Sequence, residues 1–268
     1  MKNNIREQAY NCFKCNEVEK KIELAYKLYD DHKNGNFYLK SPNLSWDLEC
    51  GRPRLPNLVA PSKLPKRKIS TETGHGALIH SIAHIEFNAI NLACDAVWRF
   101  DGLPDQFYFD WIKVTAEEAH HFQMLNFRLR ELDFEYGDFD AHNGLWELAE
   151  KTAYNPIARM ALVPKLMEAR GLDVTPLIIE KFKNIEDKNT VKILEKILLD
   201  EIGHVEIGNR WFKYLCKKGK LDSAKVFFEL IKKHHSGGLK GPLHKKARLE
   251  AGFSNLEIEQ LEQLCQKY

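Results

Sequence analysis

The stretch that decides the fold is Ala116-Glu117-Glu118-Ala119-His120-His121-Phe122, and it has a counterpart in Asp200-Glu201-Ile202-Gly203-His204. Both contain Glu-x-x-His, a spacing that places the two side chains one turn apart on the same face of a helix. A single motif of this kind means little, because roughly one such pair arises by chance in a chain of this composition. The positions of the apolar residues around each motif show which side of the helix the motif occupies, and this is more informative.

Apolar residues recur at helical spacing around both motifs, so each Glu and His shares an apolar face. Around Glu118 and His121 these residues are Trp111, Val114, Phe122, Leu125, Leu129 and Leu132, and around Glu201 and His204 they are Leu194, Ile197, Leu198, Val205, Phe212 and Leu215. The alternative register in the first motif, Glu117 with His120, shares its face with charged residues and therefore faces water. Both inward pairs are predicted to point into a core.

Two further acids complete a repeat. Glu86 lies on an apolar stripe 32 residues before Glu118, and Glu168 lies 33 residues before Glu201, where its own stripe is interrupted by Pro164 and Lys165. Buried carboxylates are costly unless they share protons, pair with cations or bind metal. Four carboxylates and two imidazoles fit two divalent ions, and they suit Fe/Fe, Mn/Fe and Mn/Mn alike.

The wider pattern predicts an all-α protein built around a four-helix bundle. Long periodic stretches cover about 76–100, 104–134, 143–170 and 187–218, with the third ending at Gly171. The predicted organisation is an N-terminal helix in 1–33, a long irregular covering segment in 34–76, the bundle in 77–218 and a basic helical tail in 219–268. A structureless segment as long as 34–76 is typical of a functional cover or a linker.

The order of one Glu and one Glu-x-x-His, repeated on four helices, resembles the ferritin-like di-iron carboxylate superfamily. More closely, GRPRLPNLVAPSKLPKR, HSIAHIEFNAINLACDAVWRF, AEEAHHF, EYGDFDAHNGLWELAEKTA, RMALVPKLMEARGLDVTP and DEIGHVEIGNRWFKYLC resemble one branch of it. That branch comprises bacterial and plant proteins long described as a domain of unknown function. The resemblance covers about residues 50–252 and leaves the N-terminal helix outside.

The resemblance implies a ferritin-like bundle that holds two metal ions, iron or alternatively manganese. Carried over to this sequence, Glu118 and Glu201 would bridge the two ions. Glu86 and His121 would be terminal ligands of one ion, and Glu168 and His204 of the other. No substrate follows from the resemblance.

Helical spacing suggests two supporting acids. Glu117 and Asp200 lie four residues before His121 and His204, so each can approach an imidazole from one turn away and fix its tautomer. The alternative is that both are solvated helix acids. His84, on the first bundle helix, is expected to be a wall or surface residue, with a ligand role as the lesser alternative.

Composition excludes several classes. The 268 residues carry 40 Lys+Arg against 38 Asp+Glu and are 44% hydrophobic, which excludes a disordered chain. Neither a membrane span nor a secretory signal is recognisable, so a cytoplasmic protein is expected. Cys12 and Cys15 form a CxxC without a second pair, which favours free thiols over a zinc site.

Charge is unevenly distributed along the chain. The stretch from Lys217 to Arg248 contains ten Lys or Arg residues and only two acidic residues. A solvated surface is the ordinary reading, and a nucleic-acid-binding patch is the sharper alternative.

Three functions fit these features. The first is an O₂-dependent oxidase or oxygenase of hydroxylase type, with a small-molecule substrate, an unidentified electron donor and a monomeric or homodimeric state. The second is a tRNA-modifying hydroxylase that uses 217–248, which the near-neutral total charge disfavours. The third is a non-catalytic metal-binding module or an iron-handling protein. Length and the added segments disfavour a ferritin shell.

Overall fold

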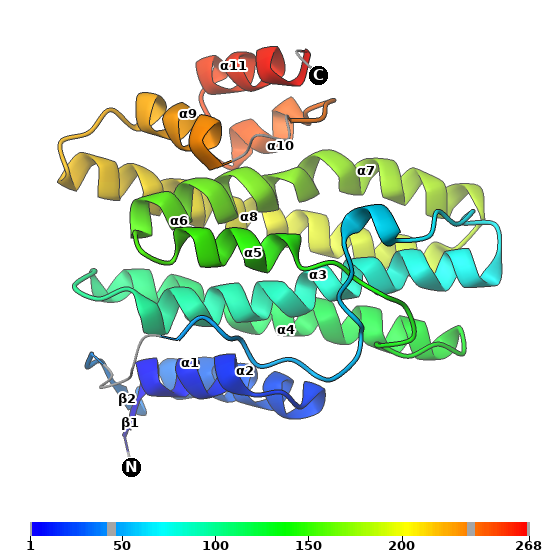
Figure 1. Ribbon diagram of the computed structural model, residues 1–268. Coiled ribbons are helices and arrows are strands. Elements are labelled where there is room, and N and C mark those ends of the chain that lie inside the picture. The colour runs from blue at the N-terminus through cyan, green and yellow to red at the C-terminus, as the bar shows by residue number, and fades with distance from the viewer. Residues whose placement is uncertain (1, 42–46, 235–238, 267–268) are drawn as a thin grey trace. The chain divides into compact units, whose positions relative to one another are not determined.

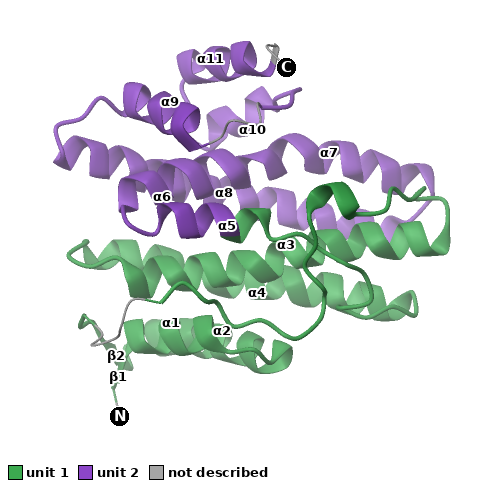
Figure 2. Cartoon of the chain, in the orientation of Figure 1, with its two compact units in different colours: residues 1–146 green, residues 147–268 purple. Residues whose placement is uncertain are grey.

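The computed structural model describes residues 2–41, 47–234 and 239–266, and the described chain is predominantly helical (Figure 1). It divides into two compact units, residues 1–146 and 147–268 (Figure 2). The helices are α1 (Ile5–Lys14), α2 (Val18–Lys33), α3 (Glu72–Arg99), α4 (Asp105–Glu131), α5 (Gly144–Thr152), α6 (Pro156–Leu162), a π-helical segment (Val163–Glu168), α7 (Ala169–Asn184), α8 (Lys188–Lys218), α9 (Ser223–His234), α10 (Lys245–Glu250) and α11 (Asn255–Gln266). The strands β1 (Asn3–Asn4) and β2 (Phe37–Tyr38) pair in parallel. An all-α protein was the sequence prediction, and helical predominance is confirmed.

The antiparallel pair α3 and α4 forms the centre of unit 1. The Thr71 side chain caps α3 by accepting the backbone N–H of Gly74 at 3.1 Å, and a short loop turns the chain back into α4. Cys94 near the end of α3 lies beside Thr115 in α4, and Glu86 lies beside His121. These two contacts fix the register of the pair.

The single N-terminal helix predicted in residues 1–33 is wrong in detail, because the structure has two helices, α1 and α2, separated by Cys15–Glu17. Lys21 explains the break. Its buried ammonium group donates to the carbonyls of Cys12 (2.8 Å) and Phe13 (3.1 Å) and to Asn91 Oδ1 (2.6 Å). Carbonyls at the end of α1 are thus satisfied by a side chain rather than by another helical turn. All six cysteines of the protein are free.

The described residues of the segment 34–76 are mostly irregular, and α3 begins four residues earlier than expected, at Glu72. Residues 42–46 of this segment lie outside the described residues. Its later part packs on the loop that follows α4: Val59 N–H donates to Ala141 O at 2.8 Å, and Ala141 N–H donates to Asn57 O at 3.0 Å. Pairing of two loops replaces the regular structure that its prolines prevent.

In unit 2, α6, the π-helical segment and α7 run antiparallel to α8. The prediction that the third bundle helix ends at Gly171 is wrong, because α7 continues to Asn184. Glycine costs a helix only about 1 kcal/mol relative to alanine, and the buried Leu172, Ile179 and Phe182 provide the packing that offsets it. Pro164, which has no N–H to donate, lies in the π-helical segment.

The tail contains α9 and α11, with α10 between them. One member of the basic stretch 217–248 is not a surface charge. Arg248 is only 1% exposed, and its Nε and Nη2 atoms donate to the two carboxylate oxygens of Asp173 at 2.9 and 2.7 Å. Residues 235–238 of the stretch lie outside the described residues.

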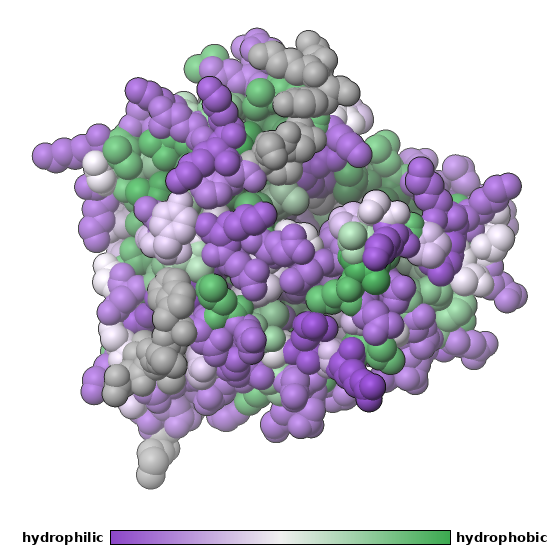
Figure 3. All heavy atoms as spheres, viewed as in Figure 1, coloured by the Kyte–Doolittle hydropathy of each residue, from purple (hydrophilic) through white to green (hydrophobic). Residues whose placement is uncertain are grey.

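The face in Figure 3 is mostly hydrophilic, with apolar side chains scattered over it, as expected for helices that bury one side. Within the described ranges, no helix is both long and apolar enough to cross a membrane.

The close approach of α8 to the π-helical segment yields a prediction. A Cβ at Gly208 would lie 2.3 Å from Pro164 Cβ, so Gly208→Ala should destabilise the metal-free protein by about 1–3 kcal/mol through overpacking. Urea denaturation measures the change. The control is Gly203→Ala on the same helix, where the Cβ meets nothing within 4 Å and helix propensity favours alanine. Equal stability of the two variants would contradict this packing.

Candidate metal centre

In unit 1, carboxylates from two helices converge on one imidazole. His121 Nδ1 lies 3.2 Å from Glu118 Oε2 and 3.4 Å from Glu86 Oε2. The relative exposures of Glu86, Glu118 and His121 are 4%, 1% and 0%. The structure therefore brings three of the predicted site residues together inside the pair of α3 and α4, and their role as metal ligands stays a prediction.

In unit 2, the second Glu-x-x-His motif lies on the inner face of α8. His204 Nδ1 lies 3.5 Å from Glu201 Oε1, and their exposures are 0% and 9%. Helical spacing produces this contact directly, since residues three apart occupy neighbouring positions on one face. The inward phase predicted for this motif matches the burial of both side chains.

Glu168 is the last residue of the π-helical segment and is half-buried. Two contacts define how this segment faces α8: Pro164 lies against Gly208, and Lys165 Nζ donates to Asn209 Oδ1 at 2.7 Å. Because the two elements run antiparallel, moving four residues forward from Pro164 corresponds to moving four residues back from Gly208. Glu168 therefore lies at the level of His204, as Glu86 lies at the level of His121.

The donor set of each unit suits a divalent cation. Glu118 and His121 in unit 1, and Glu201 and His204 in unit 2, each offer a side-chain atom of the kind that binds metal ions. In unit 1, two carboxylates lie beside one imidazole nitrogen. Carboxylate and imidazole groups such as these could hold a metal ion.

Comparison of the sequence with known proteins identifies its family. The family described as "Protein of unknown function (DUF455)" matches residues 14–259. The chain belongs to the DUF455 family. An uncharacterised protein of Haemophilus influenzae is 48% identical over 228 residues, covering 81% of this chain and 78% of that protein. No solved structure matches the chain. The match begins earlier than the resemblance over 50–252 indicated, so α2 belongs to the family region.

The two acids expected to support the imidazoles have lysine partners in this DUF455 protein. Lys113 Nζ lies 2.8 Å from a carboxylate oxygen of Glu117, and Lys196 pairs with Asp200, each from one turn earlier on the same helix. Both acids remain partly exposed. Their proposed action on His121 and His204 stays a prediction.

His84 is a buried wall residue. Its Nδ1 lies 2.9 Å from Tyr136 Oη, and its Nε2 lies 3.2 Å from the carbonyl of His142 and 3.1 Å from Asn88 Nδ2. Both ring nitrogens are engaged within unit 1. These contacts explain the residue structurally, which favours the wall reading over the ligand reading.

The sequence did not predict that two basic side chains near Glu168 are buried. Lys165 and Arg248 are 0% and 1% exposed, and they pair with Glu257 and Asp173. Burial lowers the pKa of Lys165 to about 8, and the carboxylate of Glu257 opposes that effect. A usable signal was the position of Lys165 on the inward stripe of an apolar stretch, where a lysine needs an acidic partner.

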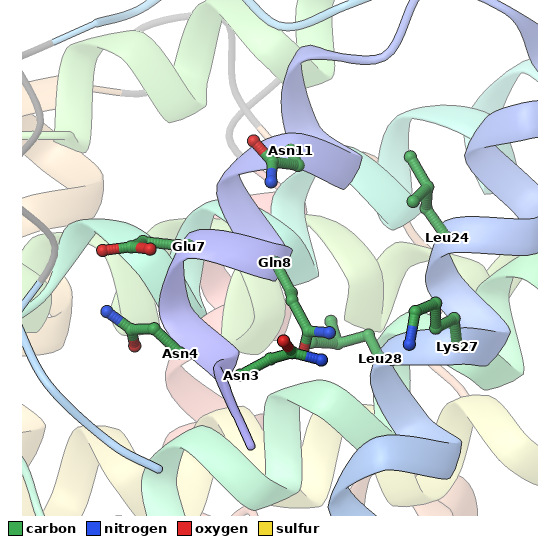
Figure 4. A pocket seen from close by; sticks show the side chains of 8 residues that line it. All are labelled: Asn3, Asn4, Glu7, Gln8, Asn11, Leu24, Lys27 and Leu28. Carbon is green, nitrogen blue, oxygen red and sulfur yellow. The ribbon is translucent and has the colours of Figure 1, made fainter. Parts of the chain in front are cut away.

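A surface hollow of about 330 Å³ lies along α1 and α2 in unit 1 (Figure 4). Polar side chains dominate its lining, which consists of Asn3, Asn4, Glu7, Gln8, Asn11, Leu24, Lys27 and Leu28. None of the six candidate ligands lines it, so this hollow is separate from the Glu/His residues.

Another buried histidine of this DUF455 protein makes stability depend on pH. His80 is 1% exposed, its Nε2 accepts the N–H of Gly137 at 3.0 Å, and burial lowers its pKa from 6.5 to about 4. The unfolded chain takes up the proton at higher pH than the folded chain, so stability is lost as pH falls from about 6.5 toward 4.

We expect His80 to account for a loss of about 2 kcal/mol between pH 7 and pH 5. His80→Gln keeps an acceptor for Gly137 and should remove that part of the pH dependence in denaturation measured at both pH values. An unaltered slope in His80→Gln would contradict the assignment.

Proposed function

We propose that the protein is a ferritin-like di-metal carboxylate protein that uses two iron ions, or manganese in their place, in an O₂-dependent oxidation of a small molecule. One observation carries the proposal. Each unit contains an antiparallel helix pair in which one helix presents Glu and the other presents Glu-x-x-His, and the second Glu follows the first by 32 positions in one unit and by 33 in the other. This is the ligand pattern of ferritin-like di-iron proteins.

The chain's own residues have defined tasks in this proposal. Glu86, Glu118 and His121 would hold one ion, and Glu168, Glu201 and His204 the other, with Glu118 and Glu201 as the shared carboxylates. Bound iron supplies redox chemistry with O₂ that no side chain of the protein provides. The buried positions of Glu118, His121 and His204 keep these donors away from bulk water.

The π-helical segment adds support. Helices with i→i+5 hydrogen bonds are rare, and they occur frequently at functional sites. Here the segment ends at Glu168, the candidate ligand whose sequence context was least regular. A distortion at this residue fits a requirement to direct one carboxylate rather than to extend a regular helix.

The alternative of a tRNA-modifying hydroxylase loses part of its basis. It relied on the basic stretch 217–248, and Arg248 in that stretch is buried against Asp173 rather than available to phosphate. The remaining lysines form an ordinary solvated surface in this proposal.

Metal content tests the proposal. Full-length protein incubated anaerobically with Fe²⁺ or Mn²⁺ and desalted should retain about two ions per chain. Glu118→Ala and Glu201→Ala should each reduce the content to about one or fewer, because each removes a shared carboxylate. Matched controls are Glu131→Ala on α4 and Glu195→Ala on α8, both exposed positions, which should retain the wild-type content. A wild-type content well below one ion per chain, insensitive to Glu118→Ala, would overturn the proposal.

Oxygen consumption separates an oxidase from a passive metal module. Iron-containing protein with a chemical reductant should consume O₂ beyond the initial oxidation of its iron, and Glu118→Ala should reduce the rate at least about tenfold. Consumption limited to the bound iron would contradict an oxidase and favour the non-catalytic or iron-handling alternative.

A further inference from the structure

We propose that Lys165 is a positioning residue for Glu168, and that the C-terminal helices α10 and α11 hold the π-helical segment in the shape that presents this carboxylate. The inference rests on the proposed di-metal function. It gives the tail, which sequence analysis treated as a basic surface, a role inside unit 2.

The first anchor is Lys165, three residues before Glu168. Its Nζ donates to Glu257 Oε1 at 2.6 Å and to Asn209 Oδ1 at 2.7 Å, so a single ammonium group links the π-helical segment to α11 and to α8. Three aromatic rings surround it, with Nζ 4.5, 4.7 and 5.5 Å from the ring centroids of Phe253, Phe227 and Phe212. Cation–π attraction to these rings further fixes the position of the ammonium group.

Glu257 is itself held in place. Its Oε2 accepts the N–H of Ser254 at 2.9 Å and the Ser254 hydroxyl at 3.1 Å, and Ser254 Oγ accepts the N–H of Glu257 at 3.2 Å. This reciprocal arrangement is a capping box at the start of α11. One carboxylate oxygen therefore fixes the helix end while the other receives Lys165.

The second anchor lies on the other side of Glu168. Arg248 of α10 pairs with both oxygens of Asp173, and its Nη2 also donates to the carbonyl of Ala169 at 3.3 Å. Bidentate Arg–carboxylate pairs fix orientation as well as distance. Residues three before, one after and five after Glu168 are thus all held by contacts from α10 and α11.

A contribution to the stability of the fold is a weak explanation for these two buried ion pairs. An apolar pair of similar volume is often as stable as a buried ion pair, because desolvation of both charges offsets their attraction. A segment distorted around Pro164 has less regular backbone hydrogen bonding to define its shape than an α-helix has. Directional contacts on both sides of Glu168 supply that definition.

The test uses Mn²⁺ binding to the full-length protein, followed by electron paramagnetic resonance. The variants are Glu257→Gln, which removes one charge, and Lys165→Met/Glu257→Met, which removes both and leaves no unpaired charge in the core. The control is Lys245→Met, which removes an exposed ion pair between α10 and α11, with Lys245 59% exposed. Thermal unfolding of the metal-free proteins accompanies the titrations.

Wild type and Lys245→Met should bind two ions and give the spectrum of an exchange-coupled pair. Both test variants should keep the first ion at wild-type affinity and bind the second about 10- to 100-fold more weakly, with a mononuclear spectrum at intermediate Mn²⁺. The double variant decides the question if Glu257→Gln unfolds. Two ions at wild-type affinity in the double variant, or equal weakening of both ions, would overturn the inference. Failure of the wild type to bind two ions would instead overturn the proposed function.

Discussion

The burial of acidic side chains is the constraint on which the rest of the structure depends. Glu86 and Glu118 lie in the interior of unit 1, within 3.5 Å of the same imidazole nitrogen. Removing a carboxylate from water costs several kcal/mol unless charge or hydrogen bonds offset it. The helix pair nevertheless buries two carboxylates at neighbouring positions. A metal ion offers a direct physical reason for it.

The two units hold similar sets of candidate ligands in different ways. In unit 1, Glu86 lies in the regular helix α3, whose packing against α4 is enough to direct it. In unit 2, Glu168 ends a π-helical segment that contains Pro164, and buried cations anchor both flanks. The motif is repeated along the chain, but the backbone that carries its first Glu differs between the two units. The additional C-terminal helices accompany the less regular half.

Periodicity in the sequence predicted most of what the structure places around the candidate ligands. The inward phase of Glu118, His121, Glu201 and His204 followed from apolar neighbours, because an amphipathic helix has only one face that can be buried. The predicted stretches 104–134 and 187–218 lie within three residues of the bounds of α4 and α8. The assembly of both halves into one bundle remains part of the proposal.

Errors arose where contacts beyond the neighbouring turn of a helix decide the outcome. The break before α2 depends on Lys21 reaching the carbonyls at the end of α1, and local propensity does not encode such a contact. Helix α7 continues through Gly171 because packing exceeds a small propensity cost. Arg248 was counted as a surface charge because its partner, Asp173, lies 75 residues away in sequence.

The central claim is that both helix pairs contribute to one dinuclear centre. Anomalous diffraction from crystals of the Mn²⁺-bound full-length protein tests it most directly. We predict two peaks about 3.5–4 Å apart, one beside Glu86, Glu118 and His121 and the other beside Glu168, Glu201 and His204. A single ion held by one unit, or two ions separated by much more than that distance, would contradict the account.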